Sequence, residues 1–144
     1  IWNESGEIVA VDFGTFRLLL PQFALVNILA GCEDNLSDMD IKKLIGRYTD
    51  IRKAIFGQPI NKTTFLTGYY PCAVQRHLEL LGYNELGYLD SSSRLPDRKV
   101  ENIWQIRKAR HNLSKTTYLN QSIGQICEAL DNFLAGVEES ILKQ

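Results

Sequence analysis

The chain has 144 residues, of which 44% are hydrophobic and 23% charged, with 16 basic against 17 acidic side chains. This length fits one domain, and the composition is that of a soluble globular protein, which excludes disordered, collagen-like and low-complexity chains. The net charge of −1 excludes a uniformly basic nucleic-acid-binding protein. Three widely spaced cysteines, with no CxxC motif, indicate reduced core thiols of a cytoplasmic protein.

The predicted elements begin with an extended arm and then become helical. Residues 1–15 are expected to form the arm, or the end of a preceding region. From Phe16 to Gly31 the apolar residues recur at helical spacing. The next helix has the clearest start, because Ser37 is an N-cap followed by acids that face the positive end of the helix dipole. Its apolar pattern continues until Gly57 ends it.

The middle of the chain is predicted to contain two shorter helices and a loop. A short helix at 63–67 is broken by Gly68, and Pro71 then opens a helix that ends at Gly82. Residues 84–96 contain glycine, proline and three serines, and this composition predicts a loop.

Two further helices are predicted at the end of the chain. Asp97 caps a helix over residues 98–113, and the last helix runs from about 120 to 142. The last helix carries a near-heptad apolar stripe suited to a bundle, made of Ile123, Ile126, Cys127, Leu130, Phe133, Leu134, Val137 and Ile141. The sequence therefore predicts one all-α domain over residues 1–144, a bundle of four to five main helices.

Basic side chains are concentrated in two segments. Residues 41–62 and residues 94–118 each carry a net charge of +5, whereas residues 119–144 carry −3. At about 100° per residue, one arc of roughly 100° on the helix at 98–113 and its continuation holds Arg107, Lys108, His111 and Lys115, with Arg110 at its edge. The opposite side, which should face a core, holds Ile106, Ala109 and Leu113.

Such a ridge of cations suits a phosphate backbone, because arginine and lysine neutralise phosphates and arginine can bind them through two N–H groups. Trp104 and Tyr118 are close enough in sequence to offer a stacking face for a base. The predicted phosphate contacts are Arg98, Lys99, Arg107, Lys108, Arg110, His111 and Lys115. A secondary basic patch, for nucleic acid or an acidic neighbouring subunit, contains Lys42, Lys43, Arg47 and Lys53. In an alternative interpretation, the ridge is a solvated face whose cations pair with the acidic last helix.

Only His77 and His111 can act as acids or bases near neutral pH, and His77 is expected to be a partly buried structural residue. The segment at 104–115, WQIRKARHNLSK, resembles the motif helix of HEPN-domain ribonucleases, small helical bundles that cleave RNA without a metal. The resemblance implies a site formed by Arg107, Arg110 and His111. Three residues separate Arg107 from His111, and aligning Arg110 instead places Lys115 at the family's histidine position.

The size, the helix count and the two basic segments are similar to those of the helical small subunit of CRISPR effector complexes, which serve antiviral defence. This resemblance implies a non-catalytic subunit that holds single-stranded RNA or DNA by its backbone, beside other protein subunits. The sequence thus predicts no enzymatic activity, no cofactor, no metal and no membrane association. A HEPN-like ribonuclease and a purely protein–protein scaffold are the alternatives.

Overall fold

The structure is a computed structural model that describes residues 20–29, 35–57, 59–85, 95–119 and 123–143. All of the regular structure in these ranges is helical, which confirms the predicted all-α bundle. The five helices are α1 (Pro21–Leu29), α2 (Asp38–Phe56), α3 (Lys62–Glu85), α4 (Leu95–Leu119) and α5 (Gly124–Lys143). The predicted arm at 1–15 lies outside the described residues, as does most of the predicted loop.

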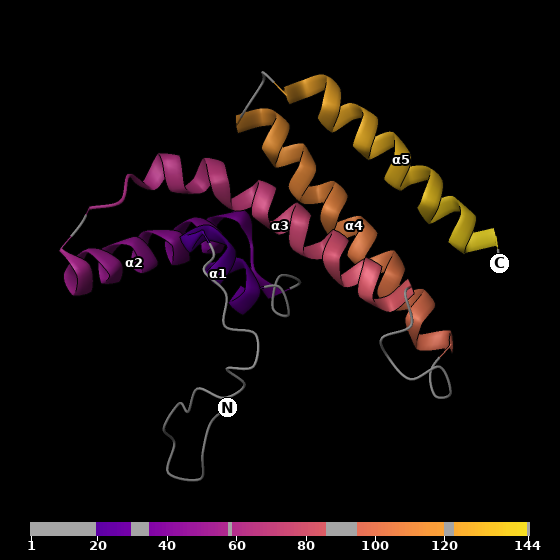
Figure 1. Ribbon diagram of the computed structural model, residues 1–144, viewed down its shortest axis with the longest axis horizontal. Helices are drawn as coiled ribbons and strands as arrows, with labels where there is room; N and C mark the ends of the chain where they lie inside the picture. Colours follow the sequence, from indigo (N-terminus) through magenta and orange to yellow (C-terminus); the bar gives the residue numbers. More distant parts are fainter. Residues whose placement is uncertain (1–19, 30–34, 58, 86–94, 120–122, 144) are drawn as a thin grey trace, which may run out of the picture.

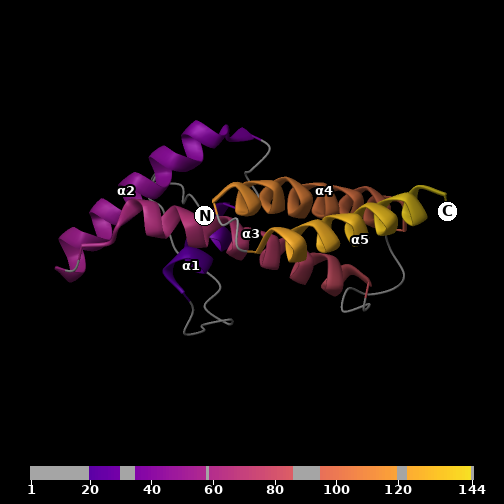
Figure 2. The same ribbon diagram turned by 90° about the horizontal axis from the view of Figure 1, so that it is seen from above.

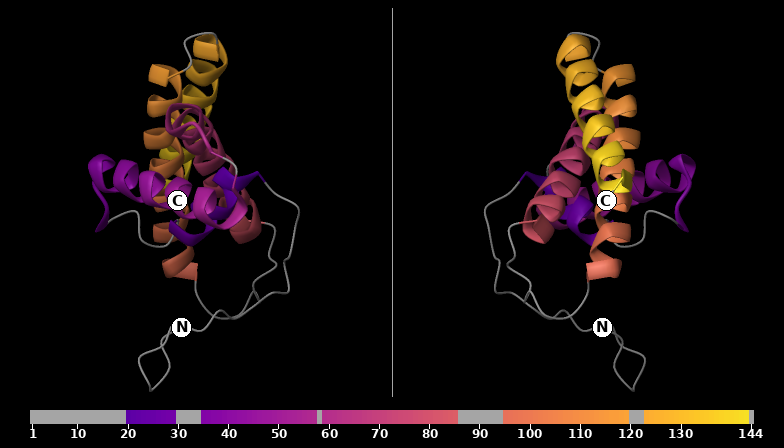
Figure 3. Two further views of the ribbon diagram at one scale, coloured as in Figure 1. Left: turned by 90° about the vertical axis from the view of Figure 1, so that its left-hand side faces the viewer. Right: turned by 90° about the vertical axis from the view of Figure 1, so that its right-hand side faces the viewer.

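The long helix α3 is the centre of the arrangement (Figure 1). Helix α4 runs antiparallel to α3 and packs along it, and α5 packs on α4, so that these three helices lie side by side (Figures 1 and 2). Helices α1 and α2 pack on the first half of α3, and α2 lies across the direction of the long helices (Figure 3). The first half of α3 therefore packs in a core with α1 and α2, and its second half packs in a core with α4 and α5.

Helix α2 begins and ends as the sequence predicts. The Ser37 hydroxyl accepts a hydrogen bond from the backbone N–H of Asp40 at 3.2 Å, and the Ser37 N–H donates to the Asp40 carboxylate at 3.1 Å. This reciprocal capping box satisfies two backbone donors that the first helical turn leaves free. At the other end, Gly57 takes the left-handed conformation with φ of 71° and donates its N–H to the Lys53 carbonyl.

The two predicted middle helices are in fact one, because α3 is continuous through the predicted break at Gly68 and the predicted start at Pro71, and it runs past Gly82 to Glu85. Pro71 lies inside it, although an interior proline removes a backbone hydrogen bond at a cost of about 3 kcal/mol. The residues on either side, Tyr70 and Cys72, are buried in the core that α3 shares with α1 and α2, and this packing keeps the helix intact. Gly68 does not break the helix either. A Cβ there would lie 2.9 Å from Nε2 of Gln22, so glycine lets α1 approach α3 closely.

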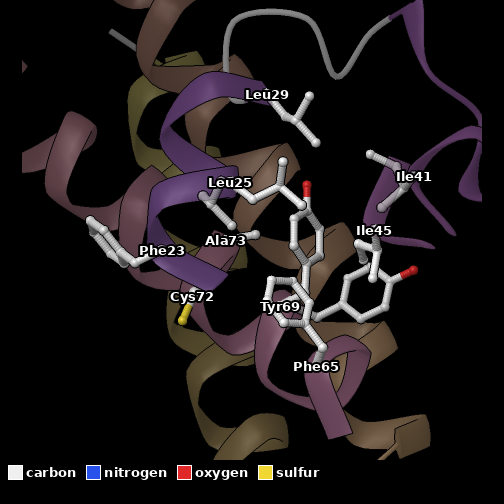
Figure 4. Close-up of a cluster of buried hydrophobic side chains, with 11 residues drawn as sticks. Phe23, Leu25, Leu29, Ile41, Ile45, Phe65, Tyr69, Cys72 and Ala73 are labelled. Carbon is white, nitrogen blue, oxygen red and sulfur yellow. The ribbon is translucent and has the colours of Figure 1, made fainter. Parts of the chain in front are cut away.

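Two cores hold the helices together. The N-terminal core lies between α1, α2 and the first half of α3, where apolar side chains from all three helices point toward one another (Figure 4). It comprises Phe23, Leu25, Val26, Leu29, Ile41, Ile45, Phe65, Tyr69, Tyr70, Cys72 and Ala73. The C-terminal core lies between the second half of α3, α4 and α5, and comprises Val74, Ile106, Ala109, Leu113, Cys127 and Leu134. The predicted inward face of the basic helix is thus confirmed, as are Cys72 and Cys127 as buried free thiols. Cys32 lies outside the described part of the chain.

The last two helices differ from their predicted form. Helix α4 extends to Leu119, six residues past its predicted end, and Thr116 and Thr117 in the added turns bond back to carbonyls one turn earlier. In α5, the predicted apolar stripe is wider than the buried face. Ile126 and Phe133 are 70% and 65% exposed, because each lies about 100° around the helix from a neighbour that faces the C-terminal core.

Candidate functional site

The predicted cation ridge on α4, hereafter the α4 ridge, comprises Arg107, Lys108, Arg110, His111 and Lys115. Its arginines contact carboxylates of α5. Arg107 Nε lies 2.7 Å from Glu138 Oε1. Arg110 grips Asp131 in bidentate fashion, with Nε 2.8 Å from Oδ1 and Nη2 3.3 Å from Oδ2, and Nη1 lies 3.3 Å from Glu138. The two arginines therefore hold α5 on α4, as the alternative interpretation expects for paired cations.

These ion pairs differ from ordinary surface pairs in their burial. The side chain of Glu138 is only 12% exposed, so its carboxylate depends on the arginines for compensation of its charge. The hydrogen bond from Arg110 to Asp131 raises the pKa of that guanidinium above its usual value. A phosphate at Arg110 would have to displace two carboxylates, which makes Arg110 a poor phosphate contact.

The C-terminal part of the α4 ridge contacts the start of α2. Lys115 Nζ donates to the Asp38 carboxylate, and His111 Nε2 lies 3.7 Å from the other oxygen of the same group. The hydrogen bond from Lys115 lowers the pKa of Asp38 below its usual value, against an opposing effect of burial. Asp38 thus ties the first turn of α2 to the last third of α4.

An open cleft of about 470 Å³, hereafter the α2–α4 cleft, lies where these helices meet over α3. It is lined from α2 and the residues before it by Leu36, Ser37, Asp38 and Ile41, from α3 by Tyr69 and Tyr70, and from α4 by Arg107, Lys108, His111 and Asn112. The structure therefore brings three members of the α4 ridge to one cavity. Arg110 lines a different hollow, between α4 and α5.

The HEPN-like site is therefore only partly assembled in one place. Arg107 and His111 share the α2–α4 cleft, but Arg110 faces α5. The predicted stacking face is wrong, because Trp104 and Tyr118 are 14 residues apart and so lie about 21 Å apart along α4. Trp104 packs edge-on against His77, with ring centroids 5.5 Å apart, while Tyr118 is 82% exposed.

The first turns of α4 hold the remaining predicted contacts of that segment. Lys99 is half-buried. The side chain of Arg98 lies outside the described part of the structure.

The secondary patch occupies the outward face of α2, hereafter the α2 basic face, and consists of Lys42, Lys43, Arg47 and Lys53. All four side chains are exposed. Lys43 has one distant ion-pair partner, Asp40 at 3.8 Å. Over the described ranges of the chain, no ion pair engages Lys42, Arg47 or Lys53.

A shallow groove of about 770 Å³ runs beside the α2 basic face. Lys43 and Arg47 line it, together with Lys62 from the start of α3, which pairs with Asp50 at 2.9 Å. Lys62 was not predicted here, because nothing local in the sequence indicates that the turn after α2 brings α3 back against it. At the C-terminal end of α2, Arg52 lies 5.1 Å over the ring of Phe56, which is 64% exposed. Phe56 is the last residue of the apolar pattern that the sequence shows up to Gly57, yet its ring is not buried.

The two basic patches meet at Asp38. Lys42 follows Asp38 by one helical turn and so lies on the same side of α2, while His111 and Lys115 contact Asp38 from α4. The α2 basic face and the α2–α4 cleft are therefore neighbouring surfaces on one side of the first turns of α2.

His77 is a structural residue, as predicted, and it is fully buried. Its Nδ1 lies 2.7 Å from the amide oxygen of Gln105, and the amide nitrogen of Gln105 donates to Glu101. This chain of hydrogen bonds joins α3 to α4 and gives a buried imidazole the polar partner it needs.

Comparisons with family models, curated proteins and solved structures give no match to this chain. Among the described helices, none is both long and apolar enough to cross a membrane. In the same part of the structure, no group of three or more histidine, cysteine or acidic side chains is placed to hold a metal ion.

Proposed function

We propose that this protein holds single-stranded nucleic acid by its phosphate backbone, without catalysis, and that the α2 basic face is the main contact surface. The observation that carries the proposal is the difference between the two basic segments. The arginines of the α4 ridge each pair with a carboxylate of α5, whereas the α2 basic face carries exposed cations, three of them without an ion pair in the described part of the chain, beside an open groove. This order reverses the ranking that the clustering of cations on one helical arc suggested, since both segments carry the same net charge.

The dimensions of the α2 basic face suit a backbone. Lys42 and Lys53 are separated by 11 residues, or about 16 Å along the helix. Cations spread over this length can contact more than one phosphate of a strand. Binding of this kind is sequence-independent and sensitive to salt.

Exposed apolar residues support a place within a larger assembly. Ile126 and Phe133 lie one above the other on the outer side of α5, away from the α2 basic face, and both are more than half exposed. Large apolar side chains paired in this way are typical of protein contact surfaces. A cytoplasmic subunit similar to the small subunit of CRISPR effector complexes would use one surface for nucleic acid and the other for its neighbours.

The test is fluorescence anisotropy with labelled single-stranded RNA and DNA at two salt concentrations. Arg47→Ala should weaken binding to all sequences equally and flatten the salt dependence by about 0.7 to 1 unit of slope. The matched control is Lys143→Ala, which removes one exposed cation from α5. Equal effects of the two variants, or none from Arg47→Ala, would show that the α2 basic face is not the contact surface.

The same samples run on a gel test the alternatives. Cleavage of RNA that is lost in His111→Ala would support the HEPN-like ribonuclease, for which the shared position of Arg107 and His111 in the α2–α4 cleft is the supporting observation. Absence of binding to both probes would favour the protein–protein scaffold, which the ion pairs of the α4 ridge and the apolar residues on α5 support.

A further inference from the structure

The α2–α4 cleft is lined by apolar and aromatic side chains as well as by cations, whereas the α2 basic face consists of cations alone. We propose that this cleft is a second, separate site that binds one nucleotide, with the phosphate group against α4 and the sugar and base against α2 and α3. Its volume of about 470 Å³ lies in the range of about 300–1,000 Å³ that small-molecule sites occupy. The proposal does not depend on strand binding by the α2 basic face.

The α4 wall of the cleft supplies the donors for a phosphate. Arg107, Lys108 and His111 lie within about one helical turn and all line the cavity. Arg107 gives its Nε–H to Glu138, yet its side chain is 63% exposed and the guanidinium carries further N–H donors in a planar fork. The His111 side chain is 54% exposed. Lys108 Nζ lies 5.6 Å over the Trp104 ring, a contact that leaves the ammonium its charge. A phosphate on this wall can therefore be approached by the two terminal nitrogens of the arginine fork, and it shares Lys108 and His111 with their present partners.

The remaining lining comes from α2, the residue before it and α3. Leu36, Ile41 and the tyrosines Tyr69 and Tyr70, which are 1% and 4% exposed, supply apolar surface beside the polar residues Ser37 and Asp38. A cavity that combines cations from α4 with apolar surface from the other elements favours a ligand that is anionic at one end and flat and weakly polar at the other. A nucleoside monophosphate has this form, whereas inorganic phosphate and an uncharged nucleoside each match only one side.

The carboxylate of Asp38 would compete with a bound phosphate for the cations of the cleft. Its carboxylate accepts from Lys115 and lies 3.7 Å from His111 at the edge of the same cavity. An incoming phosphate is repelled by this carboxylate and competes with it for the same cations. Removing the charge of Asp38 while keeping its shape should therefore strengthen nucleotide binding, an effect opposite in sign to the loss of a cation.

The experiment is isothermal titration calorimetry of the full chain with adenosine 5′-monophosphate, adenosine and inorganic phosphate as separate probes. The monophosphate should bind at least tenfold more tightly than either of the other two. Lys108→Gln should weaken its binding about fivefold or more, and Asp38→Asn should strengthen it severalfold. Arg107→Lys, which keeps the charge but loses the fork, should weaken it less than Lys108→Gln. Melting temperatures measured on the same samples show that each variant is folded.

Arg47→Ala separates this proposal from the one above, because it should leave nucleotide affinity unchanged while weakening strand binding. Equal affinity for monophosphate and inorganic phosphate would overturn the nucleotide assignment and leave a simple anion site. The proposal would also fail if the monophosphate did not saturate the protein, or if Asp38→Asn weakened binding in a folded variant. An equal loss of nucleotide affinity in Arg47→Ala and Lys108→Gln would place the site elsewhere.

Discussion

The two cores of this protein contain different kinds of side chain, although α3 contributes to both. The N-terminal core is a continuous set of aliphatic and aromatic side chains from α1, α2 and α3. The C-terminal core is smaller and is interleaved with buried polar groups, among them His77, Gln105, Asn112 and Glu138. Apolar contacts are non-directional, whereas buried hydrogen bonds and ion pairs are satisfied in only one alignment. The first core therefore supplies burial, and the second fixes how α3, α4 and α5 align.

The largest expected effect is the loss of an aromatic ring from the N-terminal core. Phe65 is 1% exposed, and truncation of a buried phenylalanine to alanine removes about 3–5 kcal/mol from the free energy of unfolding. Urea denaturation of Phe65→Ala measures this loss. Phe133→Ala is the control, because that ring is exposed, and its effect should stay within about 0.5 kcal/mol. Similar losses in both variants would mean that Phe133 is covered in solution.

The C-terminal core should respond to the loss of a polar partner as well as to the loss of volume. Gln105→Leu leaves buried His77 without its hydrogen bond and should destabilise the protein by about 1–3 kcal/mol. The double variant His77→Phe/Gln105→Leu removes both partners and should lose less than the sum of the two single changes. Strict additivity in chemical denaturation would show that the two side chains do not depend on each other.

Alanine substitutions at glycines of the long helices can show which glycines are closely packed and which face open space. A Cβ at Gly82 or Gly136 would meet no atom within 4 Å, so alanine there should stabilise the protein by about 0.5–1 kcal/mol through helix propensity. Gly68→Ala should not give this gain, because the new methyl group must displace Gln22. Thermal unfolding of the three variants measures the difference, and a gain at Gly68 equal to the others would contradict the close approach of α1.

The smallest effect concerns pH and the junction between the two basic patches. The pKa of Asp38 is lowered in the folded state, chiefly by Lys115, so the ionised carboxylate stabilises the fold above its ordinary pKa of 3.8. This contribution is lost as the pH falls through the lower folded value. Because the Asp38 side chain is 43% exposed, we expect only a few tenths of a kcal/mol. Asp38→Asn should lack this part of the acid-induced loss in denaturation curves measured between pH 5 and pH 2.

Local signals in the sequence were sufficient for the elements whose ends are set by neighbouring residues. Ser37 caps the start of α2 and Gly57 caps its end, as predicted, because capping needs only residues within one turn. Pro71 and Gly68 misled the prediction for the opposite reason. The continuity of α3 depends on burial against α1, α2 and α4, which no local pattern contains.

In the candidate site, too, local features were predictable from the sequence and contacts between distant residues were not. The common face of the α4 ridge and the buried side of α4 were predictable from helical periodicity alone. The partners of its cations were not, since Glu138 and Asp38 lie 31 and 77 residues away from Arg107 and Lys115. The acidic composition of the last helix indicated that such pairing was an alternative. The α2–α4 cleft gave no sequence signal, because it exists only where α2 meets α4.

The hydrogen bonds around Gln105 determine where a proton sits inside the protein. Glu101 accepts from the amide nitrogen of Gln105, so the amide oxygen must face His77. An oxygen can only accept, and His77 must therefore carry hydrogen on Nδ1. This proton has no direct route to water, since the ring is fully buried. Its imidazole N–H resonance should exchange slowly with solvent, which makes it a spectroscopic marker for the alignment of α3 and α4.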